Sequence, residues 1–369
     1  MKKIFSLILS LAMLLTITSG LNLTAYADSS QYGNIYYEEN ENGTIEITGC
    51  TSSATSINIP STIVGKTVTS IRNCAFYGCK SLTSVTIPNS ITSIGREAFY
   101  DCTSLTSVTI PDSVTGIGDG AFYNCKSLTN VTIPNSITMI GPDTFCRCSS
   151  LENITIPDSV TSICDHAFYE CTSLTSISIP HSVTSIDNYA FYGTSLINLS
   201  IPASVASIGE GAFNGCKSLA NVTIGNNDSA EKRSTEIGNS AFSECTSLSS
   251  VTIGNNVTSI GAAAFSDCSS LTSVTIPNSV TSIEYGTFSY CKNLTSVTIP
   301  NSVTSIGDEV FYRCSSLKNI TIPDSVTSIG DHAFFECKLV TLTMGNGVNY
   351  IDSCAFLNCE QLYEVNYNG

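Results

Sequence analysis

Cysteine is the side chain through which this sequence could do the most chemistry. The chain has 17 cysteines, and twelve of them stand three residues after a phenylalanine that recurs along the sequence. These ladder cysteines are Cys79, Cys102, Cys125, Cys148, Cys171, Cys216, Cys245, Cys268, Cys291, Cys314, Cys337 and Cys359. One repeat carries Thr194 at this position instead. Cysteines in such numbers could form disulfides, bind a metal ion or pack as small apolar residues.

The regular spacing argues against a disulfide framework for the ladder cysteines. If each repeat is one coil of a stacked fold, these side chains lie above one another with parallel Cα–Cβ directions. A disulfide requires two Cβ atoms that point toward each other. We therefore predict that the ladder cysteines are free, buried thiols that pack in the core.

The other five cysteines, Cys50, Cys74, Cys146, Cys164 and Cys354, occupy different positions of the repeat. The sequence has no CxxC motif, and a metal site needs convergent ligands, so we predict no metal and no cofactor. Cys74 and Cys354 fill a slot that holds a charged residue or a histidine in other repeats, which predicts that they face solvent. A pairing of Cys50 with Cys74 and a set of unpaired surface thiols both remain open.

Histidines and carboxylates give no catalytic constellation. His166 and His332 occur in identical D-H-A-F contexts seven repeats apart, so in a stack of coils they are separated by roughly 34 Å at ~4.8 Å per coil. No HExxH, GxSxG, P-loop or dinucleotide motif is present. Carboxylates gather before the AF pair and before the ladder cysteine, where solvated acidic turns are favoured over a rim that binds divalent cations. We predict no enzymatic activity, with a carbohydrate-active enzyme as the least favoured alternative.

These residues are carried by an internal repeat. The marker phenylalanine recurs thirteen times between Phe76 and Phe356, with a spacing of 23 residues except for 22 before Phe213 and Phe356 and 29 before Phe242. The start of each repeat alternates apolar and polar residues over a short β-branched run, which predicts a half-buried strand. Each repeat buries its apolar face only against its neighbours, so the sequence predicts a repeat solenoid of about 13 coils with stacked parallel strands and one helical or 3₁₀ turn per coil.

The repeat L-x-x-V-x-I-P-x-S-V-T-S-I-G-x-x-A-F-x-x-C resembles the BspA-like (Treponema pallidum-type) leucine-rich repeat family of secreted and surface proteins. The resemblance extends over residues 59 to 367, and the segment INIPSTIVGKTVTSIRNCAF is similar to the usual first coil of that family. It implies a leucine-rich repeat fold and a role as an adhesin or a ligand-binding surface protein that contacts host matrix proteins or other cells. The chain shows no LPxTG-like sorting signal, so secretion and surface retention are both open.

Composition and the N-terminal residues indicate export. Two lysines, an apolar run and the site Ala25-Tyr26-Ala27 have the three-part pattern of a signal peptide, and the apolar run is shorter than the ~20 residues that span a bilayer. We predict a signal peptide over residues 1–27, an N-terminal cap with a probable hairpin over 28–58 and the solenoid over 59–369. Removing the signal peptide changes the formal net charge from −15 to −17, which excludes a nucleic-acid partner bound through phosphates. We expect no transmembrane segment in the mature chain, and a monomer.

Two surfaces could bind a ligand. Polar residues of the strand that face away from the core form a neutral row of hydroxyls and amides, which suits many weak hydrogen bonds over a broad area. The candidate residues on this row are Ser84, Thr86, Thr109, Asn130, Thr132, Asn153, Thr155, Thr252, Thr275 and Thr298. The 29-residue repeat adds a charged loop with Asp228, Glu231, Lys232 and Arg233. β-propensity alone would also place Ser and Thr on the row.

We therefore expect a secreted or cell-surface binding or adhesion protein that engages a protein or glycan ligand at a cell or matrix surface. A structural or ice-binding array is the alternative, because rows of S-x-T on a regular sheet could order water. Asn interruptions and the irregular spacings argue against the regularity that such an array requires.

Overall fold

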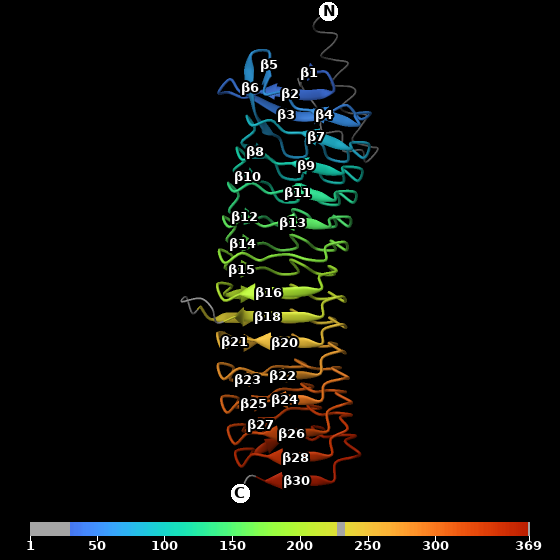
Figure 1. Cartoon of the computed structure of the whole chain (residues 1–369), viewed down its shortest axis with the longest axis vertical. Helices are drawn as coiled ribbons and strands as arrows, with labels where there is room; N and C mark the ends of the chain where they lie inside the picture. The colour runs from blue at the N-terminus through green and yellow to red at the C-terminus, as the bar shows by residue number, and fades with distance from the viewer. Residues whose placement is uncertain (1–29, 227–232, 368–369) are drawn as a thin grey trace, which may run out of the picture.

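Each repeat of the sequence folds into one coil, and the coils stack along a single elongated column (Figure 1). This computed structural model describes residues 30–226 and 233–367. The predicted signal peptide therefore lies outside the described residues. The column has about 14 turns, one more than the marker phenylalanines, because residues before the first marker already stack on the coil that follows.

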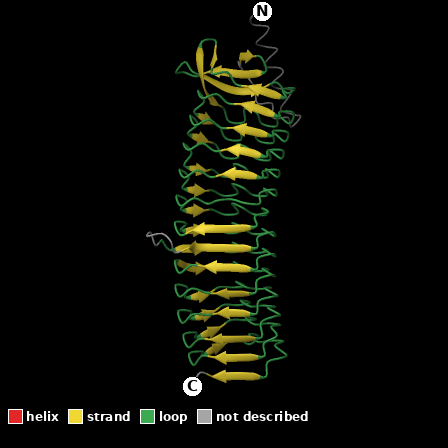
Figure 2. Cartoon of the chain, in the orientation of Figure 1, coloured by secondary structure: helices red, strands yellow, loops and turns green. Residues whose placement is uncertain are grey.

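Two columns of parallel strands run the length of the stack (Figure 2). The first column, called the strand face below, consists of β4 (Ser56–Asn58), β7 (Ser84–Thr86), β9 (Ser107–Thr109), β11 (Asn130–Thr132), β13 (Asn153–Thr155), β16 (Asn198–Pro202), β18 (Asn221–Asn226), β20 (Ser250–Ile253), β22 (Ser273–Thr275), β24 (Ser296–Thr298), β26 (Asn319–Ile322), β28 (Thr341–Met344) and β30 (Glu364–Tyr367). Neighbouring strands pair in parallel, and equivalent residues of successive repeats stand side by side, as Val108 and Val131 do. The predicted parallel stacking of half-buried strands is thus confirmed.

The second column contains the short extended piece that follows the proline of the repeat, or the glycine that replaces it at Gly225, Gly254 and Gly345. Its strands are β6 (Lys66–Ile71), β8 (Ser93–Ile94), β10 (Gly116–Ile117), β12 (Met139–Ile140), β14 (Ser162–Ile163), β15 (Ser185–Ile186), β17 (Ser207–Ile208), β19 (Thr235–Ile237), β21 (Val257–Ile260), β23 (Ser282–Ile283), β25 (Ser305–Ile306), β27 (Ser328–Ile329) and β29 (Tyr350–Ile351). Ile91 and Ile94 of one such piece are buried, as predicted. Because both isoleucines are buried, their side of the extended piece faces the core.

The N-terminal end is built from antiparallel hairpins that lead into the stack. β1 (Ser30–Tyr32) pairs with β2 (Ile35–Glu39), and β2 pairs with β3 (Ile45–Cys50). β3 then pairs in parallel with β6, while β5 (Thr62–Ile63) forms a hairpin with β6. The edge of the first coil is thereby covered by strands of the same chain, which is how solenoids protect their ends.

A stack of phenylalanine rings forms the centre of the core. The marker phenylalanines from Phe76 to Phe334 are fully buried. Neighbouring rings stack nearly parallel, as in Phe213 on Phe242, where the ring centroids are 5.2 Å apart. Each coil contributes one ring, and the rings of neighbouring coils stack on one another. They form the continuous core that was predicted from the repeat.

The segment around each phenylalanine is not helical, and no helix occurs among residues 30–226 and 233–367. The predicted helical or 3₁₀ turn is replaced by consecutive turns. In these turns, successive N–H groups donate alternately to the next coil and to their own coil. Phe76 donates to the carbonyl of Ala98 in the next coil at 2.7 Å, whereas Tyr77 donates to a carbonyl three residues earlier in its own coil at 3.1 Å. Residues two before and two after the phenylalanine take positive φ values, such as 54° at Glu97 and 58° at Asp101. A right-handed helix cannot contain such residues.

Many hydroxyls of the repeat hold adjacent coils together. In several repeats the serine two residues after the proline donates to a carbonyl of the preceding coil, as Ser113 does to Ile91 at 2.6 Å. Threonines that directly precede a strand of the second column also donate to the preceding coil, as Thr184 does to the Thr161 carbonyl at 3.0 Å. Part of the Ser and Thr content of the sequence is therefore used for stacking.

Candidate binding surfaces

Strand-face hydroxyls differ from those that hold the coils together. The threonines at the third position of the strand are exposed, and none of their hydroxyls has a hydrogen-bond partner among the described residues. They are Thr86, Thr109, Thr132, Thr155, Thr252, Thr275 and Thr298. Ser84 is half-buried and donates to Ser56 at 3.0 Å. The row therefore presents donors and acceptors to solvent that the fold does not use.

One part of the strand face is hollowed. Asn130 and Thr132 of β11 and Asn153 and Thr155 of β13 line a shallow cavity of about 480 Å³. β11 and β13 pair in register, which places Asn130 beside Asn153 and Thr132 beside Thr155. Four of the residues predicted from the sequence thus lie together. Asp158 lies at the rim and is the sole charged residue among those that line the cavity.

The hollow lies next to an interruption of the strand face. β13 ends a five-stranded sheet, and the face resumes in a separate sheet formed by β16, β18 and β20. Residues Ser176 and Ser178 of the intervening repeat are exposed and form no strand. Thr252 belongs to this second sheet, and Thr275 and Thr298 belong to a third sheet, formed by β22 and β24. The structure therefore does not bring all predicted strand-face residues into one site.

The charged loop is only partly described. Asp228, Glu231 and Lys232 lie outside the described residues. Arg233 is exposed just before β19, and its carbonyl accepts a hydrogen bond from the Asn256 side chain at 3.3 Å. Nothing in the described part of the loop brings it to the hollow of the strand face.

A second cavity, of about 680 Å³, lies on the edge formed by the turns after the phenylalanines. The repeat that contains Phe191 is one residue short and carries Gly193 and Thr194. Gly193 and, in the next coil, Gly215 line this turn-edge cavity, and neither has a side chain to fill it. The sequence analysis did not assign a site here. The 22-residue spacing and the absent ladder cysteine were the signals that could have located it.

The turn-edge cavity concentrates basic groups on an acidic chain. Lys126, Arg147 and Lys217 line it together with Glu170 and Glu244. The Arg147 guanidinium forms an ion pair with Glu170, with Nε and Oε2 3.0 Å apart. Within the described ranges, the ammonium groups of Lys126 and Lys217 have no ion-pair partner. Basic groups outnumber acidic ones here, so this cavity can accept an anionic group better than the hollow of the strand face, whose one charged lining residue is acidic.

Ladder thiols act as hydrogen-bond donors as well as core residues. Ten of the twelve are buried, and Cys79 and Cys359 at the ends of the ladder are half-buried. From Cys102 onward, each thiol donates to the carbonyl of the phenylalanine one coil earlier, at 3.1 Å for Cys102. Burial raises the pKa of Cys216 to about 11, so this thiol keeps its proton at neutral pH. The prediction of buried thiols is confirmed for ten of the twelve ladder cysteines, and the hydrogen bond to the phenylalanine carbonyl is an addition to it.

The off-ladder cysteines are placed differently from one another. Cys74 is exposed, as predicted, and Cys354 is half-buried. The Sγ atom of Cys74 lies 3.7 Å from a Glu97 carboxylate oxygen. Cys50 does not approach Cys74, because its Sγ atom lies 3.1 Å from that of Cys79. The pairing of Cys50 with Cys74 considered from the sequence is therefore wrong.

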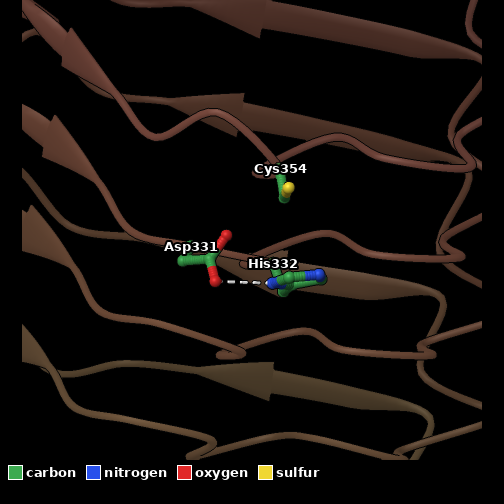
Figure 3. A group of neighbouring side chains, drawn as sticks. All are labelled: Asp331, His332 and Cys354. Carbon is green, nitrogen blue, oxygen red and sulfur yellow. Dashed lines mark ion pairs between the residues drawn. The ribbon is translucent and has the colours of Figure 1, made fainter.

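One group of side chains in the described residues could hold a metal ion. Ligand atoms of Asp331, His332 and Cys354 all lie within 4.8 Å of one another. Figure 3 shows Asp331 and His332 side by side and Cys354 on the neighbouring coil. Spacings along the chain do not indicate this group, because its members meet across two coils.

Comparison with known proteins agrees with the repeat geometry. The family model described as "BspA type Leucine rich repeat region (6 copies)" matches residues 48–151, 138–234 and 235–363. The chain belongs to the BspA-type leucine-rich repeat family. Members of this family are typically surface or secreted proteins, leucine-rich repeat proteins usually bind other proteins, and no catalytic family is indicated. No sequence among the curated proteins matches the chain.

Solved structures place this BspA-type protein among similar solenoids. A leucine-rich cell surface protein from Faecalibacterium prausnitzii is 32% identical, with a TM-score of 0.56 over 93% of this chain and 95% of the other. A leucine-rich repeat protein from Bacteroides ovatus is 24% identical, with a TM-score of 0.56 over 92% of this chain and 100% of the other, which supports the fold alone. No helix among the described residues is long and apolar enough to cross a membrane.

Proposed function

We propose that this BspA-type protein is an exported or surface-displayed adhesin that engages a protein or glycan through the strand face. The observation that carries the proposal is the contrast between two sets of hydroxyls in the same coil. Hydroxyls such as that of Ser113 bond to the preceding coil, whereas Thr132 and Thr155 are exposed and make no such bond. β-propensity explains threonine on a strand, but it does not distinguish these two sets.

The hollow between β11 and β13 is the proposed centre of the contact. Two amides and two hydroxyls converge there over about 480 Å³. Neutral donors and acceptors of this kind match the hydroxyls of a glycan or the backbone and amide groups of a protein surface. A shallow polar cavity fits a broad contact of many hydrogen bonds better than a small apolar ligand.

The test is binding of the mature chain to immobilised host matrix proteins and microbial surface glycans. The double variant Thr132→Lys, Thr155→Lys fills the hollow with bulky charges on exposed positions. The matched control Thr275→Lys, Thr298→Lys makes the same change on β22 and β24, away from the hollow. We expect binding to fall at least tenfold in the first variant and to remain in the control.

Two further variants decide whether another surface binds the ligand. Lys126→Ala with Lys217→Ala removes the unpaired charges of the turn-edge cavity. Exchange of residues 228–233 for glycine and serine removes the charged loop and leaves β19 intact, where the buried Thr235 donates to the Val205 carbonyl at 2.6 Å. If either change abolishes binding while the hollow variant binds normally, the strand-face proposal is refuted.

The ice-binding alternative requires a lattice of evenly spaced groups. The strand face is divided into separate sheets and is interrupted at Ser176 and Ser178. No observation favours that alternative over ligand binding. Absence of thermal hysteresis in a solution of the protein would remove it.

A further inference from the structure

Cys79 differs from every later rung of the cysteine ladder. Each later thiol donates to the carbonyl of a phenylalanine one coil earlier, beginning with Cys102 and Phe76 at 3.1 Å. No marker phenylalanine precedes Phe76, so Cys79 has no such carbonyl. Its Sγ atom lies instead 3.1 Å from Sγ of Cys50, which is the last residue of β3. The ladder therefore begins with two facing thiols.

We propose that Cys50 and Cys79 form a disulfide in the exported protein and that this bond fastens the N-terminal cap to the first coil. The inference rests on the proposed export, because disulfides persist in oxidising compartments. The two sulfur atoms are about 1 Å farther apart than in a disulfide, for which ~2.05 Å is usual, so small side-chain movements close the bond. Both residues are half-buried, and both sulfur atoms belong to the same contact.

Selectivity for this pair follows from the environment of the other thiols. No other contact between two cysteine sulfurs is found in residues 30–226 and 233–367. Burial raises the pKa of ladder cysteines such as Cys125 and Cys268, which keeps them as unreactive thiols. Either thiol can donate to the other across the 3.1 Å contact, so whichever of Cys50 and Cys79 loses its proton is stabilised by the S–H group of its partner. Either residue of the pair can therefore supply the attacking thiolate.

The reaction requires an oxidant, which we name as a disulfide of the class RSSR, either glutathione disulfide or the active-site disulfide of a thiol oxidoreductase. The thiolate of one cysteine of the pair attacks one sulfur of RSSR, forms a mixed disulfide and releases one RS⁻. The thiolate of the other cysteine then attacks the sulfur of the first cysteine and releases the second RS⁻. Two cysteine thiols lose two electrons, RSSR gains them, and the two thiol protons pass to the RS⁻ groups to give two RSH.

The bond would act at the part of the solenoid that opens most readily. Terminal repeats contact a single neighbour, so local unfolding of a solenoid starts at its ends. Closing the chain between residues 50 and 79 ties β3 to the turn segment of the first coil. We expect reduction of the bond to accelerate proteolysis and hydrogen exchange in the cap and to leave the middle coils unchanged.

The test is a thiol count on the chain without its predicted signal peptide. The protein is oxidised with glutathione disulfide, acid-quenched, denatured and alkylated without reductant, and its intact mass and peptides are measured. We expect two fewer alkylated thiols than the seventeen of the sequence and one cross-linked peptide pair that contains Cys50 and Cys79. Cys50→Ser removes the cross-link, and the nearby control Cys74→Ser retains it.

Alkylation of all seventeen thiols, or a cross-link that joins other cysteines, would refute the pairing. Protein isolated from its native cells gives a separate result. A pair that oxidises in vitro but remains reduced in the cells refutes the proposed export and leaves the geometry of the pair standing.

An independent observation concerns the group formed by Asp331, His332 and Cys354. His332 and Cys354 occupy the same slot of successive coils, two residues before the marker phenylalanine. Nδ1 of His332 lies 2.7 Å from Oδ2 of the neighbouring Asp331, and all three residues are half-buried. Figure 3 shows the Cys354 thiol on the coil next to this pair. Three ligand types that bind zinc thus meet at one point of the solenoid edge.

The geometry points to a binding site for Zn²⁺ or a similar borderline transition-metal ion at these three residues. Bonds of about 2.0 Å to nitrogen and oxygen and 2.3 Å to sulfur place tetrahedral ligands roughly 3.3–3.6 Å apart. The observed spread of up to 4.8 Å closes to that range by rotation of these half-buried side chains. Water would complete the coordination. Soft thiolate and imidazole ligands select such ions over Ca²⁺ and Mg²⁺.

The chain contains its own control for this site. Asp165 and His166 repeat the same D-H-A-F sequence. The following coil carries Tyr189 where Cys354 stands, and the Tyr189 ring stacks on His166 with centroids 5.5 Å apart. The second Asp–His pair therefore has no third ligand and is partly covered.

The test uses the full chain, freed of metal with a chelator and kept reduced with a phosphine. Titration with Co²⁺ should produce a thiolate-to-metal absorption band, and Zn²⁺ should displace the Co²⁺. We expect His332→Ala and Cys354→Ser to weaken binding at least tenfold and to remove the band, and His166→Ala to change neither. Equal binding by Cys354→Ser and the unchanged protein, or a loss in His166→Ala, would overturn the proposal.

Discussion

Two adjacent alanines, Ala262 and Ala263, allow a direct test of the backbone geometry that replaces the predicted helical turn. Ala263 has a φ of 54°, in the left-handed region, whereas Ala262 does not have a positive φ. Both are half-buried. The Ala263 N–H donates to the Tyr285 carbonyl of the next coil at 2.7 Å, and that bond holds the residue in place.

Glycine at the two positions should have opposite effects on the free energy of unfolding. The left-handed conformation costs an L-residue roughly 1–2 kcal/mol, and glycine avoids this cost. Glycine also loses more backbone entropy on folding, which costs about 0.5–1 kcal/mol. We therefore expect Ala263→Gly to stabilise the protein by about 0.5–1 kcal/mol and Ala262→Gly to destabilise it by a similar amount.

The assay is urea unfolding monitored by circular dichroism. Because a long repeat array need not unfold in one step, hydrogen exchange at this coil is measured as well. Ser240, with a φ of 53°, occupies the same slot one coil earlier. Adding Ser240→Gly should approximately double the gain. If both alanine substitutions destabilise equally, the left-handed conformation does not strain the chain, and the explanation given for the missing helix fails.

Three further predictions follow from the core, the N-terminal cap and the strand-face register. Phe242→Ala should lower the free energy of unfolding by about 3–5 kcal/mol, because the Phe242 ring stacks on Phe213 at 5.2 Å and on Phe265 at 5.3 Å. Phe356→Ala, at the half-buried end of the stack, should lower it clearly less in the same urea assay. The hydrogen bond from Arg72 lowers the pKa of Glu38 below the usual value of a glutamate. The stability that the ionised Glu38 provides is therefore present above the unfolded pKa and is lost as the pH falls through the lower folded pKa. Glu38→Gln should therefore destabilise the cap at pH 7 and make no difference in acid, and the exposed Glu41→Gln is the control in thermal unfolding at both pH values. Val131→Thr places a hydroxyl at a position of β11 that is 2% exposed, and it should lower the free energy of unfolding by about 1–3 kcal/mol. Thr132→Val, at the exposed neighbouring position, should change the free energy of unfolding in urea by no more than about 0.5 kcal/mol.

Sequence periodicity was sufficient to predict the coil, its two extended pieces and most of the core. Val303, Ile306 and Phe311 follow the apolar pattern and are buried, and Val297 is partly buried against the same core. The turn around the phenylalanine could not be predicted from such a pattern, because A-F-x-x-C has the same apolar spacing in a helical turn and in the observed alternating turns. Bonds to the next coil decide between them, as that from Phe76 to Ala98 does.

The sequence could place residues that repeat in register beside one another, but it could not locate features that depend on irregularities of the repeat. Asn130 and Asn153 stand together because parallel pairing repeats the same position on adjacent strands. The turn-edge cavity arises because one coil is a residue short and Gly193 leaves space, which no motif search detects. The contact of Cys50 with Cys79 depends on how the N-terminal hairpins return to the first coil.

By itself, the sequence determined that this protein is a stack of coils with a phenylalanine and a thiol in nearly every turn, because a fixed period forces equivalent residues onto equivalent positions. Tertiary structure alone decided which hydroxyls remain available for a ligand, which thiols face each other and which ligands of a metal ion meet. Each of those outcomes depends on a distance between neighbouring coils. Periodicity specifies that two coils are adjacent, but only the packed backbone specifies where their side chains point.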